Sequence, residues 1–129
     1  AEALAAERPA SFHTVTCLDM LEHVPDYPST VQACADLAIS GGELFFSTIN
    51  RNPKAYALAV VGAEYVLGLL PKGTHDYGKF IKPSELAAAV RRAGLVVRDM
   101  TGMRYNPFSK KCSLSSDMDV NYLLHASKP

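Results

Sequence analysis

Two carboxylates and an imidazole lie close together near the start of this sequence, in the stretch TCLDMLEHVPD. Asp19, Glu22 and His23 follow one another at spacings of three residues and one residue. If a helical turn begins at Asp19, residues three and four apart share one face of it, so the three side chains can converge. Carboxylate and imidazole groups together suit Mg²⁺, Mn²⁺ or Zn²⁺, and the carboxylates favour hard cations. The pattern is therefore that of a candidate divalent-metal site.

The same spacing also has a purely structural explanation. An aspartate commonly accepts a hydrogen bond at the start of a helix, and a glutamate three residues later completes a capping box. In that alternative Asp19 is the N-cap, Glu22 is its partner and His23 lies on the surface. The elements that position these residues have to decide between the two alternatives.

The order of apolar segments predicts an α/β domain. Phe12–Leu18 and Glu43–Ile49 are rich in β-branched and aromatic residues, as buried strands are. Thr30–Ile39 between them repeats apolar residues at helical spacing, with Ser29 as its predicted N-cap and the SGG stretch as its end. A strand, a helix and a strand in this order form a unit with parallel strands, and ligands bind beyond the carboxyl ends of such strands. Asp19 directly follows the first of these ends.

The later half of the chain adds a helix and two strands. Pro83 begins the predicted helix and Gly94 ends it. Leu95–Tyr105 and Asp119–Ser127 are predicted strands that pair antiparallel across a polar loop. Four strands are fewer than a doubly wound domain usually has, and no G-x-G-x-x-G loop follows a first strand. We therefore expect the chain to be the second half of such a domain.

Composition and charge argue against several classes of protein. The formal net charge is zero, so nothing overall indicates a nucleic-acid binder. Residues 1–50 nevertheless carry seven acids and one base, whereas residues 51–129 carry twelve bases and six acids. No apolar run reaches about 18 residues, so no membrane-spanning helix is expected. The three cysteines are widely spaced without a C-x-x-C motif. Cys17 and Cys34 lie in apolar patterns, which is typical of buried thiols in a reducing compartment.

A long apolar segment runs from Ala55 to Leu70, with Glu64 as its only charge. One interpretation is a buried helix of the domain. The other is an interfacial helix that lies on a membrane surface, with lysines flanking it and tyrosines within it. On the second interpretation the residues that contact the membrane or an apolar substrate tail are Tyr56, Val60, Val61, Tyr65 and Leu67.

Several stretches together resemble one family of enzymes. They are TCLDMLEHVPD, SGGELFFSTINRN, VVGAEYVLGLLPKGTHDYGKFIKPSEL, GMRYNPFS and DVNYLLHASK, and they run from about Phe12 to the end of the chain. They are similar to the ubiquinone-biosynthesis O-methyltransferases. The chain departs from that family in having Asp19 where a glutamate is usual and Ser40 where a proline is common. It also lacks the family's first three strands, which hold the main motif for S-adenosylmethionine.

The resemblance implies a fold and a reaction. The fold is the C-terminal half of a seven-strand, Rossmann-like class I methyltransferase sheet, with parallel strands and a C-terminal antiparallel pair. Residues 1–129 form this partial domain, with an apolar helical insertion at about 53–80. The reaction is methyl transfer from S-adenosylmethionine to a hydroxyl of a polyprenylated catechol or dihydroxybenzoate in ubiquinone synthesis. Without the glycine-loop half, we expect the 129 residues alone to be inactive.

The resemblance also implies roles for individual residues. Leu18 and Asp19 would contact the cofactor, and Asp19, Glu22 and His23 would bind a divalent metal, with Mg²⁺ the first expectation. A phenol has a pKa of about 10, and a cation bound to the two vicinal oxygens would stabilise the phenolate that attacks the methyl group. His23, where it does not bind the metal, and His75 are the candidate bases. His75 has the alternative of being an exposed loop histidine.

The implied setting is the cytoplasmic face of a bacterial inner membrane, with the enzyme peripheral to it. Its expected partners are the polyprenyl lipid substrate, the membrane surface and other proteins of ubiquinone synthesis. Nucleic acid is not an expected partner. RYNPFSKK, residues 104–111, is accordingly predicted to be a strand end and hairpin loop rather than a nucleic-acid patch. Two alternatives stay open, a fragment without activity that serves as an interaction domain and a methyltransferase for another acceptor such as RNA.

Overall fold

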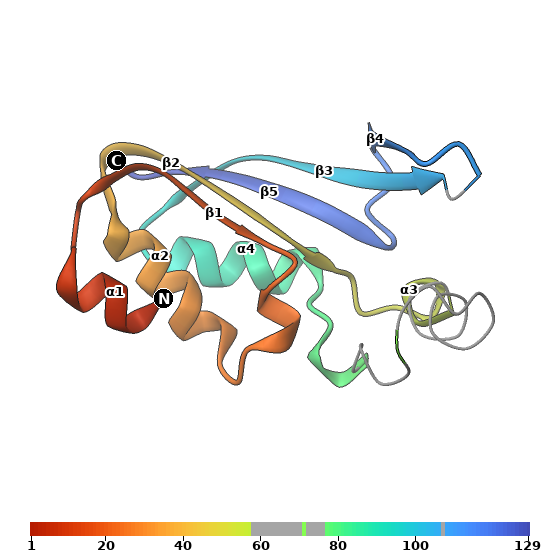
Figure 1. Cartoon of the computed structure of the whole chain (residues 1–129), viewed down its shortest axis with the longest axis horizontal. Helices are drawn as coiled ribbons and strands as arrows, with labels where there is room; N and C mark the ends of the chain where they lie inside the picture. Colours follow the sequence, from red (N-terminus) through yellow and green to blue (C-terminus); the bar gives the residue numbers. More distant parts are fainter. Residues whose placement is uncertain (58–70, 72–76, 107) are drawn as a thin grey trace.

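The computed structural model describes residues 1–57, 71, 77–106 and 108–129. The described elements in chain order are α1 (Glu2–Glu7), β1 (Phe12–Leu18), the 3₁₀-helix Leu21–His23, α2 (Tyr27–Leu37), β2 (Ala38–Ile49), α3 (Pro53–Ala55), the 3₁₀-helix Tyr77–Lys79, α4 (Pro83–Arg92), β3 (Val96–Asn106), β4 (Lys111–Ser115) and β5 (Asn121–Ser127). The strands form one curled sheet in the order β1-β2-β5-β3-β4, and α1, α2 and α4 lie on the same side of it (Figure 1). The predicted α/β fold class is confirmed.

The parallel pair that the sequence predicts is β1 and β2. Leu18 at the end of β1 lies opposite Ser47 in β2, and α2 connects the two strands. β5 runs antiparallel to β2, and β3 runs antiparallel to β5, as predicted for the last pair. The ends of β1, β2 and β3, at Leu18, Ile49 and Asn106, therefore lie at one edge of the sheet, which we call the carboxyl edge.

The hydrophobic core lies between the sheet and helices α2 and α4. Val31 from α2 and Leu86 from α4 meet Phe46 and Tyr122 from the middle of the sheet, and all four are buried. The hydroxyl of Tyr122 donates a hydrogen bond to the carbonyl of Ile81 at 2.7 Å. Burial raises the pKa of Tyr122, so this hydroxyl keeps its proton. Its hydrogen bond fixes the segment that leads into α4 against the sheet.

Helix α2 begins and ends earlier than predicted. It begins at Tyr27 rather than Thr30, because Asp26 and not Ser29 is the N-cap. The side chain of Asp26 accepts a hydrogen bond from the backbone N–H of Ser29 at 3.3 Å. Pro28 fits the first turn that follows, where a helix needs no N–H donor.

The predicted end of that helix was also wrong, because Ser40–Gly42 lies inside β2. The helix ends at Leu37, and β2 begins at Ala38. Lys128 satisfies carbonyls at this junction, since its Nζ donates to the carbonyls of Ala35 at 2.8 Å and Ala38 at 2.9 Å. Contacts from the far end of the chain thus override the local signal for a helix end.

A fifth strand occupies the predicted polar loop. β4 pairs antiparallel with the outer part of β3, with Gly102 opposite Ser115 and Asn106 opposite Lys111. Its side chains are mostly exposed, so it lacks the apolar pattern of a buried strand. The count of four strands was therefore one short because a solvated edge strand carries little sequence signal.

The loop after β4 is held down by Asp117. Its Oδ2 lies 3.2 Å from Nζ of Lys54 and 3.1 Å from a guanidinium nitrogen of Arg104. A hydrogen bond from the backbone N–H of Asp119 is the largest cause that lowers the pKa of Asp117 to about 2, and a hydrogen bond from Lys54 is the next. The carboxylate therefore stays charged. The loop backbone crosses Gly102 so closely that a Cβ there would lie 1.7 Å from the carbonyl oxygen of Asp117.

We expect Gly102→Ala to lower the free energy of unfolding by about 1–3 kcal/mol, because an added methyl group must displace backbone. Urea denaturation of this variant beside Ser113→Ala, a change on the exposed hairpin, measures the effect. The control should stay within about 0.5 kcal/mol of the parent protein. Equal stability of the two variants would contradict the close approach.

Candidate active site

β1 ends in a tight turn at Asp19, whose φ is 51°. Few residues other than glycine adopt this left-handed conformation readily, and aspartate tolerates it better than most. The backbone N–H of Asp19 donates to the carbonyl of Ser47 at 3.1 Å and to its Oγ at 3.0 Å. The same Oγ donates to Oδ1 of Asp19 at 3.1 Å. These bonds clamp the end of β1 to β2 and direct the following residues over the carboxyl edge.

The next turn of chain buries a carboxylate. Glu22 lies in the 3₁₀-helix Leu21–His23 and is only 4% exposed. The hydroxyl of Thr48 in β2 donates to Oε2 of Glu22 at 2.7 Å. Oε1 of Glu22 lies 3.9 Å from Nε2 of His23, whose side chain is about half exposed. A buried carboxylate is thus held from below by a strand hydroxyl and faces an imidazole at the solvent boundary.

This arrangement decides against the capping box. The short helix has Met20 as its N-cap and no side-chain cap bond, so Asp19 and Glu22 do not form the predicted reciprocal pair. Among the residues that the structure describes, no three or more His, Cys, Asp or Glu side chains form a group that could hold a metal ion. The structure brings Glu22 and His23 together, whereas Asp19 is bonded to Ser47. The three-ligand metal site stays a prediction.

Two large apolar side chains project from the same edge. Leu18 and Met20 are each 49% exposed and flank Asp19. Apolar surface next to a few polar groups suits a ligand with both kinds of surface. The predicted contacts of Leu18 and Asp19 with a cofactor agree with this placement and stay a prediction.

The chain leaves β2 through an anchored turn at this edge. The backbone N–H of Asn50 donates to the carbonyl of Val120 at 2.7 Å. The guanidinium of Arg51 lies 2.9 Å from the carboxylate of Glu85 at the start of α4. The side chain of Asn52 accepts from the N–H of Ala55 at 2.8 Å and so caps α3. The base of the predicted apolar insertion is therefore fixed at the carboxyl edge.

Of the residues predicted to contact a membrane or an apolar tail, the structure describes Tyr56. It is 44% exposed and packs edge-on against Tyr77, with ring centroids 5.4 Å apart. The buried and the interfacial helix both stay predictions for this segment. The remaining residues of that prediction and the second candidate base lie outside the described residues: Val60, Val61, Tyr65, Leu67 and His75.

Two further histidines are sheet residues. His13 lies in β1, and His125 lies in β5. The ring of His125 stacks on Phe45 with centroids 4.7 Å apart, and its Nε2 contacts the carboxylate of Glu43. This second Glu–His pair lies toward the opposite end of β2 from the carboxyl edge.

Sequence reasoning missed the two hydroxyl residues that organise the site, Ser47 and Thr48. Both are buried, and they hold Asp19 and Glu22 respectively. The signal was present in FFST, where an apolar strand ends in two hydroxyl residues. In a parallel pair, such residues lie next to whatever follows the neighbouring strand.

Comparison with known proteins places the chain among methyltransferases. The family model described as "Methyltransferase domain" matches residues 1–99. A ubiquinone biosynthesis O-methyltransferase of Stutzerimonas stutzeri is 62% identical over 128 residues, which are 99% of this chain and 55% of that protein. The protein of the same name from Nitrosospira multiformis is 65% identical over 95% of this chain and 52% of its own length. The chain spans about half the length of the curated relatives it matches.

Solved structures share the fold at low sequence identity. A SAM-dependent methyltransferase from Thermotoga maritima has a TM-score of 0.63 at 16% identity and covers 95% of this chain and 58% of its own. A magnesium protoporphyrin IX methyltransferase from Synechocystis, solved with bound SAH, has a TM-score of 0.60 at 20% identity, with 97% and 48% covered. Within the described ranges, no helix has the length and apolar character needed to cross a membrane.

We expect Thr48→Val to lower the free energy of unfolding by about 1–3 kcal/mol, because the buried carboxylate of Glu22 loses its donor. Thr16→Val is the matched control, since Thr16 is an exposed threonine on β1. Urea denaturation of both variants tests the contact. If Thr48→Val lowers the free energy of unfolding no more than Thr16→Val does, the hydroxyl of Thr48 does not hold Glu22.

Proposed function

This chain belongs to the methyltransferase-domain family, and we propose that the polypeptide that carries it methylates a catechol hydroxyl in ubiquinone biosynthesis. The methyl donor is S-adenosylmethionine, and the acceptor is a polyprenylated catechol or dihydroxybenzoate. The relatives at 62% and 65% identity support this proposal through their name. The proposal concerns the whole polypeptide, because the chain covers about half of those relatives.

The observation that carries the chemistry is the Glu22–His23 pair at the carboxyl edge. An aryl hydroxyl has a pKa of about 10 and must lose its proton to attack a methyl group efficiently. Nε2 of His23 takes that proton, and Oε1 of Glu22, 3.9 Å away, stabilises the imidazolium that forms. The oxygen–methyl bond then forms as the sulfur–methyl bond breaks. Thr48 keeps Glu22 oriented throughout, through its bond to Oε2.

The metal part of the proposal rests on the same two residues. Carboxylate and imidazole are suitable ligands in kind, but Asp19, the predicted third ligand, is bonded to Ser47. A cation here therefore requires Asp19 to leave Ser47 or a ligand from another part of the polypeptide. When bound, Mg²⁺ would supply Lewis-acid stabilisation of the phenolate. His23 acts as the base where its imidazole does not bind such a cation.

The apolar segment after β2 fits an acceptor that resides in a bilayer. Its base is anchored at the carboxyl edge, beside the candidate site, and Tyr56 there is exposed. We propose that it lies on the cytoplasmic face of a bacterial inner membrane, so that the polyprenyl tail stays in lipid while the ring reaches the site. The side chains proposed to contact lipid or the tail are Tyr56, Val60, Val61, Tyr65 and Leu67.

The test is methyl transfer by the polypeptide at its natural length, from methyl-labelled S-adenosylmethionine to a catechol with a short prenyl tail. We expect the double variant Glu22→Gln with His23→Ala to lose about 100-fold or more in turnover, as loss of a general base does. The matched control is Glu43→Gln with His125→Ala, which removes the other Glu–His pair.

The control variant should retain the parent rate, and calorimetry should show unchanged affinity for S-adenosylmethionine in both variants. Equal turnover of the two double variants would show that Glu22 and His23 do not take part in methyl transfer. Retained cofactor affinity without transfer to any catechol, even by the parent protein, would instead point to another acceptor.

A further inference from the structure

The β3–β4 hairpin exposes an apolar surface that the proposed active site does not use. Phe108 at its tip is 96% exposed, Leu114 is 68% exposed and Tyr105 is 57% exposed. Apolar side chains scattered singly over a surface need no explanation, but a contiguous group of large ones marks an interaction site. The question is what this surface contacts.

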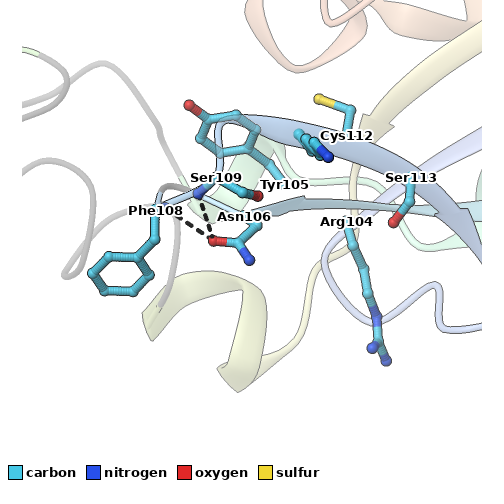
Figure 2. A pocket seen from close by; sticks show the side chains of 8 residues that line it. Arg104, Tyr105, Asn106, Phe108, Ser109, Cys112 and Ser113 are labelled. Carbon is cyan, nitrogen blue, oxygen red and sulfur yellow. Dashed lines mark hydrogen bonds between the residues drawn. The ribbon is translucent and has the colours of Figure 1, made fainter.

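The strand register gives the hairpin two different faces. Residues paired across the two strands point to the same side, and successive residues alternate. One face is apolar and carries Met103, Tyr105, Cys112 and Leu114. The other is polar and carries Arg104, Asn106, Lys111 and Ser113. Figure 2 shows Tyr105 and Cys112 on one side of the ribbon and Arg104 on the other, with Phe108 at the tip.

The hairpin is positively charged. No acid occurs between Asp99 and Asp117, whereas Arg104, Lys110 and Lys111 lie in that interval. Arg104 is paired with Asp117 at 3.1 Å. Neither lysine forms an ion pair with any residue that the structure describes. Within the described part of the chain, two cations without a carboxylate partner therefore accompany the apolar tip.

The tip also projects beyond the sheet. Met103 is the last residue of β3 that pairs with β5, and Arg104–Asn106 pair with β4. At about 3.4 Å per residue, this overhang carries the tip roughly 10 Å past β5. The projection starts from the carboxyl edge, at the same end of the molecule as α3 (Figure 1). An overhang of this length matches the depth of about 5–10 Å to which interfacial elements enter a bilayer.

We propose that the β3–β4 hairpin is a second membrane-contact element, which inserts Phe108 at the boundary of headgroups and acyl chains of an anionic bilayer. Lys110 and Lys111 then meet lipid phosphates, and the apolar face with Tyr105 and Leu114 lies in the interface. The contact itself stands on the hairpin alone. Its purpose, to hold the carboxyl edge against the membrane that contains the acceptor, rests on the proposed function.

Charge and shape favour a bilayer over the other occupants. A second copy of the chain would cover the apolar face but would bring like charges together at the tip. Single-stranded nucleic acid calls for a cationic groove that follows its backbone, with aromatic rings for successive bases. The hairpin offers instead one ring at its tip, a second ring and Leu114 on its apolar face, and two lysines without an ion-pair partner among the described residues, which is the pattern of an interfacial anchor.

The first measurement uses Phe108→Trp, because the chain contains no tryptophan. The natural-length polypeptide and this variant are titrated with vesicles of phosphatidylglycerol and phosphatidylethanolamine, and the parent emission is subtracted. We expect a blue shift and quenching by brominated lipid. Leu4→Trp, at a residue 43% exposed in α1, is the control and should show neither change. Unshifted emission of the Phe108→Trp variant on vesicles that bind the protein would overturn the proposal.

The second measurement is vesicle flotation. Lys110→Gln with Lys111→Gln should weaken binding to anionic vesicles by about fivefold per lysine. Phe108→Ser should weaken it by about tenfold. Leu4→Ser is the control for a lost apolar side chain and should float like the parent. Thermal unfolding and turnover with the short-tail acceptor should match the parent in all of these variants.

The outcomes separate the hairpin from the other proposals. If Val61→Asp with Leu67→Asp lowers flotation while the hairpin variants float like Leu4→Ser, the apolar segment stands and the hairpin proposal falls. If Phe108→Ser abolishes a dimer or an RNA complex without changing flotation, the surface serves that partner and the proposal also falls. If the hairpin variants lose flotation as expected but the parent protein transfers no methyl group, the membrane contact of the hairpin is supported. Only its proposed purpose is then overturned.

Discussion

The register of β1 against β2 is the constraint on which the rest of this structure depends. With Leu18 opposite Ser47, the two hydroxyl residues at the end of β2 lie beneath the turn that follows β1. Ser47 clamps Asp19, and Thr48 satisfies Glu22, so Glu22 can be buried while it still faces His23. A slip of one residue would turn each side chain of β1 to the other face of the sheet and separate these partners.

Local sequence signals predicted the elements whose ends are marked by their own residues. The bounds of β1 agree with the prediction because its β-branched and aromatic run stops at Leu18, and α4 begins at Pro83 as predicted. The N-cap of α2 was misassigned because Asp26 and Ser29 are both good capping residues and lie one turn apart. The start of β2 depends on contacts with β1 and with Lys128, which local patterns do not contain. β4 pairs with its neighbour β3 and was missed because its exposed side chains lack the pattern of a buried strand.

The candidate site was predictable in its place but not in its environment. The end of a parallel strand predicted that Asp19, Glu22 and His23 lie at the carboxyl edge, and the structure places them there. The burial of Glu22 depends on Thr48, 26 residues away in sequence, so neither residue's surroundings could be deduced from the motif. The motif also suggested that three side chains converge, whereas the left-handed backbone at Asp19 and its bonds to Ser47 direct that carboxylate toward β2.

We propose that the turn over the carboxyl edge, residues 18–23, faces the cofactor and the acceptor. Hydrogen exchange of the natural-length polypeptide, with and without S-adenosylhomocysteine, measures this contact, because the amide of Asp19 is hydrogen-bonded to Ser47 and reports any opening of the turn. We expect slower exchange over residues 18–23 on binding, with no change in β4. Protection confined to other segments, with residues 18–23 unchanged by a saturating ligand, would contradict it.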